Sequence, residues 1–345
     1  MKNHKVLCPV AFSPCLCYNG QAEVRDLKLY FAPMEGVTDH IFRKVHHRYF
    51  GGADKYFTPF FSPTADGRFP PRDRRDFDPD VNRGLPVVPQ LLTRYAPDFL
   101  WAAGALADMG YGEINLNLGC PSGTVTAKGK GSGLLDRREE LEKLLDGIFA
   151  HPPAAISVKT RLGRNDPEEF PRLLELFNRY PIHELTVHCR VGADFYRKPA
   201  RPLAFTLPLT QSRSPVCYNG DLSTLEAFRS FEAGFPAAPA AMVGRGAVAD
   251  PALLRRIKGG APADRSTLEE YTNALYDGYS AAFGSPRAAL GRMKEIWFYQ
   301  SCLFEGTEPY MKALRKTTDP HHYRDLTARI LGECPIRAQG ALPAW

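Results

Sequence analysis

The sequence predicts an α/β protein: a (β/α)8 TIM barrel followed by a small all-helical C-terminal domain. Eight short runs of mostly β-branched and aromatic residues lie between residues 27 and 243, and most precede a stretch with helical spacing. Polar residues gather just after these runs, at the strand ends where such barrels carry their chemistry. Beyond Gly260 the pattern is helical only.

The strands of this barrel are expected in eight places along the chain. They are residues 27–32, 55–58, 86–92, 113–117, 155–161, 184–188, 215–218 and 241–243. Helices are expected at 39–49 after a Thr38 cap, from Asp136 onward, and at 96–109, 166–180, around 225–228 and at 251–257. Residues 62–84 are rich in proline and arginine and predict no helix, and Phe60 and Phe61 are expected in a loop.

An open, doubly wound sheet is the alternative arrangement of alternating strands and helices. Such a sheet usually carries a glycine-rich phosphate turn after its first strand. Here that turn reads Pro33-Met34-Glu35-Gly36. The number of strands and the position of the polar residues therefore favour the barrel.

Length, charge and cysteine content set further bounds. A chain of 345 residues has room for a barrel of about 250 residues and an appendage, and a net charge of +6 mildly favours a polyanionic partner. No apolar run approaches the ~20 residues of a membrane span, and no secretory signal is present. The eight cysteines include no C-x-x-C pair, so no metal site is indicated and we expect reduced thiols in the cytoplasm.

The domain boundaries follow from these patterns. We expect an N-terminal extension at 1–26, the barrel at 27–258, a linker at 259–264 and the helical domain at 265–345. Helices in the last part are expected at 266–283, 287–303, 308–317 and 320–332. Its basic residues are Arg287, Arg292, Lys294, Lys312, Arg315, Lys316 and Arg324, and they alternate with Trp297, Phe298, Tyr299 and Tyr310. Two interpretations stay open: solvated basic faces around an aromatic core, or an RNA-binding surface.

The most specific stretch of the chain is residues 113–135, EINLNLGCPSGTVTAKGKGSGLL. Its strand pattern breaks at Gly119, and Cys120 and Pro121 follow at once. A thiol placed where a strand ends in a glycine turn is presented at the edge of the sheet, with room for a substrate. The glycines from 123 to 133 are typical of a loop that moves or wraps a ligand. By itself, a single cysteine is more often a small buried hydrophobic residue.

This stretch resembles the signature of the tRNA-dihydrouridine synthases, FMN enzymes that reduce particular uridines in tRNA. Further blocks that resemble the family occur in the family's order over residues 27–258: APMEGV at 32–37, QLLT at 90–93, VKTR at 158–161, His188, NGD at 219–221 and GRG at 244–246. The helical tail shows a weaker likeness. One departure is Val191-Gly192-Ala193, where family members usually carry Thr and then Gln before a Tyr, and Tyr196 preserves part of that loop. The resemblance therefore gives no prediction of contacts between this loop and the target base.

The resemblance implies a site at the mouth of the barrel. It implies Cys120 as the general acid, with Asn117 and Arg161 near the target uracil. The residues implied at the FMN are Pro33, Met34, Glu35, Gln90, Lys159, His188, Asn219, Gly220, Asp221, Gly244 and Arg245. The chemistry of these residues agrees: the loops after the last two strands offer N–H groups and a cation for the phosphate. A lysine stabilises the reduced isoalloxazine edge, and the Gln90 amide can both donate and accept.

The functional hypothesis is therefore an FMN-containing tRNA-dihydrouridine synthase that uses NADPH or NADH. We expect a cytoplasmic monomer with tRNA as its partner, without a metal and without a membrane anchor. A flavin barrel that reduces a small molecule of the dihydroorotate or enone type is one alternative, and the basic helical tail argues against it. A non-catalytic RNA-binding protein is the other, and Cys120, Lys159 and Gln90 argue against it.

Overall fold

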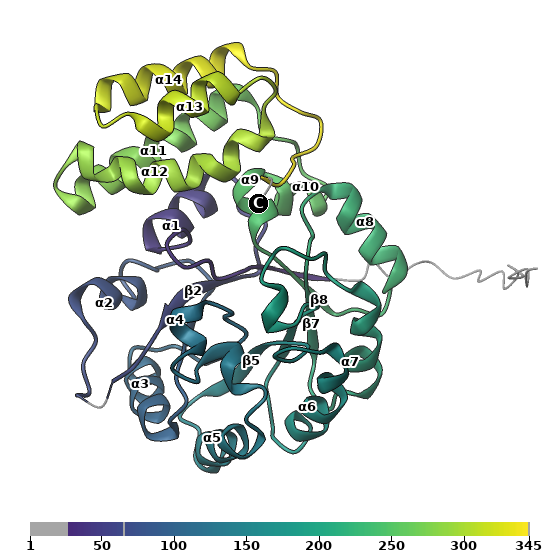
Figure 1. The fold of residues 1–345 in the computed structure, drawn as a ribbon. Helices are drawn as coiled ribbons and strands as arrows, with labels where there is room; N and C mark the ends of the chain where they lie inside the picture. The colour runs from purple at the N-terminus through teal and green to yellow at the C-terminus, as the bar shows by residue number, and fades with distance from the viewer. Residues whose placement is uncertain (1–26, 65, 344–345) are drawn as a thin grey trace, which may run out of the picture.

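Eight parallel strands close into a barrel, with β1 paired to β8 (Figure 1). The computed structural model describes residues 27–64 and 66–343. The strands are β1 Lys28–Phe31, β2 Lys55–Phe61, β3 Val87–Leu91, β4 Glu113–Leu118, β5 Ala155–Arg161, β6 Leu185–His188, β7 Val216–Asn219 and β8 Ala240–Val243. The predicted fold class is confirmed, while the expected N-terminal extension lies outside the described residues.

Helices surround the barrel and connect its strands. They are α1 His40–Tyr49, α2 Pro71–Phe77, α3 Ala96–Asp108, α4 Gly123–Thr126, α5 Arg138–Ala150, α6 Phe170–Phe177, α7 Thr206–Gln211, α8 Leu225–Gly234, α9 Arg245–Ala249 and α10 Leu253–Ile257. The prediction of a helix opening after Asp166 is confirmed, because Asp166 and Glu169 form a capping box over a 3-10 turn that leads into α6. The helix predicted from Asp136 begins at Arg138 instead.

The register of the strands brings their carboxyl ends to one level. Arg161 pairs with His188, His188 with Asn219, and Asn219 with Met242. On the other edge of β5, Asn117 of β4 pairs with Lys159. Residues far apart in the sequence therefore meet at one mouth of the barrel.

Two local expectations for residues 58–84 were wrong. β2 continues to Phe61, so Phe60 and Phe61 lie in the strand and not in a loop. The strand passes Pro59 by a shift in register, because proline has no N–H to donate, and pairing resumes at Phe60. The segment after it contains α2, which starts on Pro71, and the helix is held by tertiary contacts that local propensity does not reveal.

The start of α1 also differs from the prediction. Its N-cap is Asp39, whose carboxylate accepts from the Phe42 N–H, and not Thr38. The Thr38 hydroxyl instead accepts from the Met34 N–H at 2.8 Å. It thus fixes the loop between β1 and α1, which leads to the barrel mouth.

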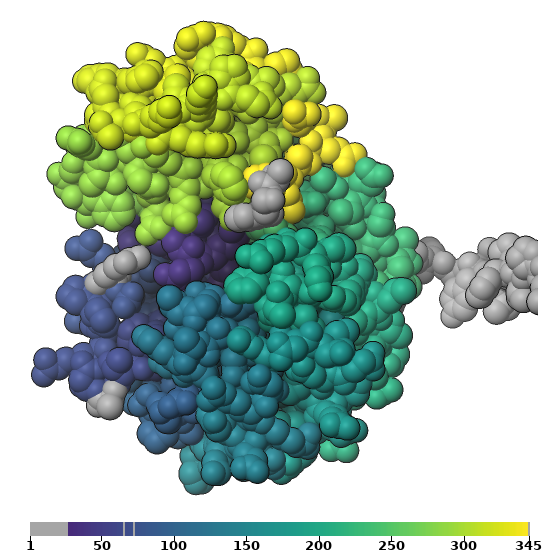
Figure 2. All heavy atoms as spheres, in the orientation of Figure 1, coloured from purple at the N-terminus to yellow at the C-terminus, as the bar shows by residue number. Residues whose placement is uncertain are grey.

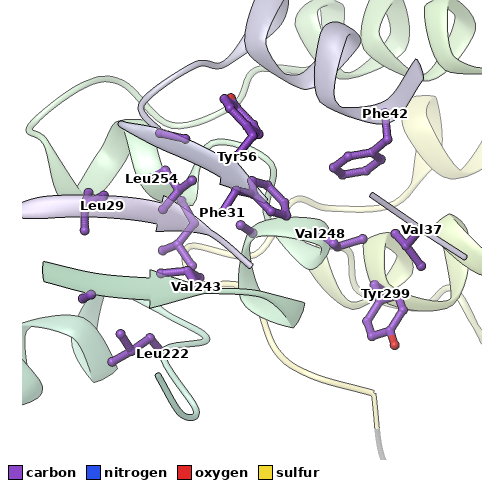
Figure 3. Packing of buried hydrophobic residues seen from close by; sticks show 14 of the residues in the cluster. Leu29, Phe31, Val37, Phe42, Tyr56, Leu222, Val243, Val248, Leu254 and Tyr299 are labelled. Atoms are coloured by element: carbon purple, nitrogen blue, oxygen red, sulfur yellow. The ribbon is translucent and has the colours of Figure 1, made fainter. Parts of the chain in front are cut away.

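Four helices follow the barrel, as predicted: α11 Arg265–Phe283, α12 Pro286–Gln300, α13 Glu308–Lys316 and α14 Pro320–Glu333. We call residues 265–333 the helical region. It rests on the N-terminal part of the barrel, which Figure 2 shows as yellow-green atoms against purple ones. Tyr299 of α12 lies beside Val37 and Val248 of the barrel (Figure 3), so the two parts share one core.

Asp39 also connects the barrel to the helical region. Its carboxylate accepts from the Tyr279 hydroxyl at 2.9 Å and lies 3.8 Å from the Arg292 guanidinium. Arg292 also donates to the Gly36 carbonyl. The helical region is therefore anchored to the loop that carries Pro33, Met34 and Glu35.

The aromatic residues that alternate with the basic ones in the helical region differ in burial: Trp297 and Tyr299 are buried, while Phe298 and Tyr310 are partly exposed. Trp297 is fully buried and donates to the Tyr323 hydroxyl at 3.0 Å. Lys294 donates to the carbonyl of Thr317, the residue that caps the C-terminal end of α13, so its ammonium group already has a partner within the helical region. Lys312, Arg315 and Lys316 are exposed. Among the helices of residues 27–64 and 66–343, none has the length and apolar character needed to cross a bilayer.

Candidate active site

A cavity of about 370 Å³ lies at the carboxyl ends of the strands. Its size is within the range of small-molecule sites. All fourteen residues predicted for the site line it: Pro33, Met34, Glu35, Gln90, Asn117, Cys120, Lys159, Arg161, His188, Asn219, Gly220, Asp221, Gly244 and Arg245. The fold therefore brings the predicted site together completely, and the role of each residue stays a prediction.

Cys120 is held at the cavity by its own backbone. The Asn117 carboxamide oxygen accepts from the Gly119 and Cys120 N–H groups, both at 2.9 Å. The Cys120 carbonyl accepts from the Ser132 N–H at 3.0 Å. Burial raises the pKa of the Cys120 thiol above its ordinary value. The thiol is therefore protonated at neutral pH, as a proton donor must be.

The glycines that follow Cys120 support it and do not form an open loop. They fold into α4 and a short 3-10 helix at Gly131–Leu134, and the residues of the 3-10 helix are buried. Gly131 has a φ of +57°, and a Cβ there would stand 2.7 Å from the Cys120 carbonyl oxygen. A side chain at this position would push the turn that carries Cys120 away, so glycine is required by close packing. The stretch expected as a loop is therefore folded into two short helices next to the turn that carries Cys120.

A chain of amide hydrogen bonds crosses from β5 to β3 below the cavity. The Asn115 carboxamide donates to Ser157 at 2.9 Å and accepts from Gln90 at 2.8 Å, and Asn117 donates to the Gln90 oxygen at 2.7 Å. These bonds fix which end of the Gln90 amide is the donor. Gln90 still has one N–H and one lone pair to offer a ligand.

Arg161 and Lys159 both come from β5, but their environments differ. Arg161 donates to the carbonyls of Gly119 at 2.9 Å, Val191 at 2.8 Å and Phe195 at 3.1 Å, so it joins two loops of the mouth. Lys159 donates to the Asn219 carboxamide oxygen at 3.1 Å. Burial, with the neighbouring charge of Arg161, lowers the pKa of Lys159 to about 8. Lys159 thus remains largely protonated at neutral pH.

A second network lies at the ends of β6 to β8. The Arg190 guanidinium donates to both carboxylate oxygens of Asp221, at 2.7 and 2.5 Å, and lies 3.0 Å from His188 Nε2. Arg245 donates to the same carboxylate at 2.8 Å. Burial opposes ionisation of Asp221, but these partners outweigh it, so the pKa of Asp221 is lowered.

His188 is neutral in this network. Burial comes first and the charges of Arg161, Lys159, Arg190 and Arg245 add to it, so the pKa of His188 lies well below its ordinary value. The Arg190 guanidinium can only donate, so His188 Nε2 accepts and the proton is on Nδ1. The imidazole can therefore donate one hydrogen bond to a ligand but cannot act as a cation.

Some residues of the cavity were not selected from the sequence. Phe60 lies one residue before the end of β2, Arg190 follows β6, Tyr299 comes from α12 and Leu342 from the C-terminal segment. Arg190 stands two residues after His188, and its position after a strand end was a usable signal. Tyr299 and Leu342 carry no such signal, because only the docking of the helical region and of the C-terminal segment after it brings them to the barrel. The described residues contain no cluster of three or more His, Cys, Asp or Glu suited to a metal ion.

Comparison with known proteins identifies relatives of this chain. The model of the family described as dihydrouridine synthase (Dus) matches residues 30–288. A tRNA-dihydrouridine(16) synthase of Cupriavidus necator is 31% identical over 249 residues, covering 69% of this chain and 76% of that protein. A tRNA-dihydrouridine(16) synthase of Ralstonia nicotianae is 32% identical over 240 residues, covering 67% and 73%. The old yellow enzyme from Trypanosoma cruzi shares the fold, with a TM-score of 0.50 at 9% identity over 73% of this chain and 93% of that chain.

Proposed function

The chain belongs to the dihydrouridine synthase family, and on this premise we propose that it reduces the C5=C6 bond of specific uridines in tRNA, using FMN and NADPH or NADH. The observation that carries the proposal is that Cys120 shares one cavity with the residues expected at the flavin and at the uracil. The two relatives named for position 16 support uridine 16 as the target.

The residues of the cavity fit a flavin mononucleotide. Gln90 offers one donor and one acceptor to the carbonyl and N–H edge of the ring system, and Lys159 offers a positive charge. Gly220, Gly244 and Arg245 would hold the phosphate. A Cβ at Gly244 would stand 3.2 Å from the Ala32 Cβ, so glycine leaves this corner open. A single phosphate corner favours FMN over a dinucleotide.

Reduction of uracil requires a hydride at C6 and a proton at C5. The C5=C6 bond is conjugated to the C4 carbonyl, so negative charge develops at C5 and O4 when C6 accepts the hydride. A flavin held by Gln90, Lys159 and Arg245, once reduced by the nicotinamide, would supply this hydride. The Cys120 thiol supplies the proton to C5 as a general acid. Its raised pKa keeps the proton in place until charge develops on the carbon.

Asn117 and Arg161 are proposed to line the uracil and also to position the acid. Asn117 holds the N–H groups of Gly119 and Cys120, and Arg161 holds the Gly119 carbonyl. Together they fix the turn from which the thiol projects. A positioned acid needs this rigidity, because a small displacement of the donor costs much of its rate.

The partner proposed is folded tRNA, from which the target uridine must be extruded to reach the mouth of the barrel. The exposed Lys312, Arg315 and Lys316 of α13 are proposed to contact its phosphates. We propose a cytoplasmic monomer, with its domain boundaries at 26 and 258, and the chemistry assigned to Cys120 requires no metal ion.

The direct test is reduction of a tRNA transcript that lacks dihydrouridine. Purified protein is expected to be yellow, to release FMN on denaturation, and to form dihydrouridine at position 16 when given NADPH or NADH. Chromatography identifies the flavin, and mapping of the modified nucleoside identifies the position. Recovery of FAD, absence of flavin after reconstitution with FMN, or an unmodified transcript would overturn the proposal.

A further inference from the structure

A second cavity, of about 340 Å³, lies beside the catalytic cavity. It is bounded by the loop between β1 and α1, the end of β2, α2, and the end of α11 with Arg292 of α12. Glu35 and Phe60 line both cavities, so the two hollows share a wall. Residues of both the barrel and the helical region line each of them.

The apolar side of the second cavity includes phenylalanine rings beside Ile41, Pro59, Pro71 and Ala282. Phe60 and Phe61 come from β2 and Phe283 from the end of α11. Phe283 is 46% exposed, one of five large hydrophobic residues that are exposed among those described. Its ring stacks on Tyr279, with centroids 5.8 Å apart, so its orientation is fixed although its surface is open. Flat aromatic surfaces of this kind stack nucleobases with little dependence on sequence.

The polar side of the cavity is mostly acidic. The acidic residues that line it are Glu35, Asp39, Asp73 and Asp76, together with His40 and the cations Arg75 and Arg292. The charge of Arg292 faces Asp39 and Glu295, whereas Arg75 is exposed at the edge. Carboxylates repel phosphate but accept hydrogen bonds from the N–H groups of bases. Asp39 and Asp76 already accept hydrogen bonds from the chain itself, but a carboxylate has about four acceptor sites. The cavity therefore still offers acceptors to the N–H groups of a base, while the exposed Arg75 can contact a phosphate outside.

We propose that this second cavity binds the nucleobase next to the target uridine in the same RNA strand. The inference rests on the proposed function, because a uridine in the catalytic cavity is tethered to its neighbours through their phosphates. The neighbour therefore lies near the catalytic cavity, and the hollow that adjoins this cavity at Phe60 offers aromatic rings for stacking. Extrusion breaks the stacking of the target with its neighbours, and Phe283 restores stacking for one of them.

The test is a double-mutant cycle between Phe283 and the RNA. Affinity for tRNA is measured without reductant, for transcripts that are intact or abasic at the nucleotide on the 5′ or the 3′ side of the target. Phe283→Ala removes the ring, and Phe283→Leu keeps an apolar side chain without a stacking face. Tyr95→Ala is the matched control, because Tyr95 is 50% exposed and lines neither cavity.

For the wild type, an abasic neighbour on one side is expected to weaken binding by about 5- to 100-fold, as loss of one stacked base does. Both Phe283 variants should remove most of this penalty, and Tyr95→Ala should keep it. An equal penalty in all four proteins, or none in the wild type on either side, would overturn the inference. Dihydrouridine formation in intact tRNA is assayed separately, so a failure of the proposed function is seen on its own.

Discussion

At the scale of single residues, the side chains of the catalytic cavity are oriented by backbone groups of the chain itself. The Asn117 carboxamide oxygen accepts from two N–H groups of the turn that carries Cys120, and Arg161 donates to three backbone carbonyls. Burial and neighbouring positive charges also lower the pKa values of Lys159 and His188. The cavity thus combines a protonated thiol, a lysine whose pKa is lowered to about 8 and a neutral imidazole.

The role of Cys120 is tested by replacement with alanine. Cys120→Ala is expected to retain the flavin and its reduction by NAD(P)H, while uridine reduction slows about 10²- to 10⁴-fold, the usual loss for a positioned acid. The pKa of the Cys120 thiol is raised above the ordinary cysteine pKa of about 9. Deprotonation of this thiol should therefore not lower the wild-type rate until the pH exceeds about 9. Single-turnover reduction of tRNA as a function of pH measures both effects.

Cys302→Ala is the matched control, because Cys302 is a half-buried free thiol that does not line the catalytic cavity. It should reduce tRNA at the wild-type rate. If Cys120→Ala also did so, the proton would have to come from another group or from water.

At the scale of elements, the loop between β1 and α1 joins the cavity to the helical region. Asp39 caps α1 and accepts from the buried Tyr279 hydroxyl, while Met34 and Glu35 of the same loop line the cavity. Burial raises the pKa of Asp39, so the negative charge of its carboxylate is unfavourable in the folded protein. The carboxylate stabilises the fold through the hydrogen bonds that its oxygen accepts. The α12 helix completes the connection through Arg292 and Tyr299.

Asp39→Ala is therefore expected to destabilise the protein by about 2–4 kcal/mol, since it removes a cap and leaves a buried hydroxyl unpaired. Asp39→Asn keeps an acceptor oxygen without the charge, so its cost should stay below about 1 kcal/mol. Denaturant unfolding of the three proteins measures the difference. Equal destabilisation by the two variants would show that the ion pair with Arg292 holds the loop, and not the acceptor oxygen.

At the scale of the whole molecule, the basic residues exposed on the helical region are distinct from the residues that form its core and its local contacts. Trp297 and Tyr323 belong to the core, and Arg292 and Lys294 to local contacts. Among the basic residues singled out from the sequence, those that are exposed are Arg287, Arg324 and the three of α13, and α13 lies far from the helices on the opposite side of the barrel, such as α5 and α6 (Figure 1).

Reversal of Lys312, Arg315 and Lys316 to Glu is expected to raise the KM for tRNA and leave NAD(P)H oxidation unchanged. For each phosphate that the variant no longer binds, the salt dependence of tRNA binding should fall by about one unit of slope. The matched control reverses Lys143, Arg172 and Arg229, which are exposed on α5, α6 and α8. Titrations at several salt concentrations compare the two. Equal effects of the two triple variants would mean that only net charge matters, and α13 would not bind the tRNA.

Local sequence determined most of the barrel. Each strand is a short buried run with its own period, and each helix has its own spacing, so their order and approximate bounds can be predicted without knowledge of the fold. The strand ends could be predicted for the same reason, and with them the position of Gln90, Cys120, Lys159 and His188 at one mouth. Parallel strands in register place such residues together whatever the loops do.

Only the tertiary structure decided how these side chains are used. The pairing of Arg190 with Asp221, the support of Cys120 by Gly131, and α2 all depend on contacts between segments distant in the chain or on close packing. Tyr299, more than a hundred residues beyond Cys120, reaches the cavity because α12 docks on the barrel. Periodicity records which face of an element is buried, but it carries no information about the partner that buries it.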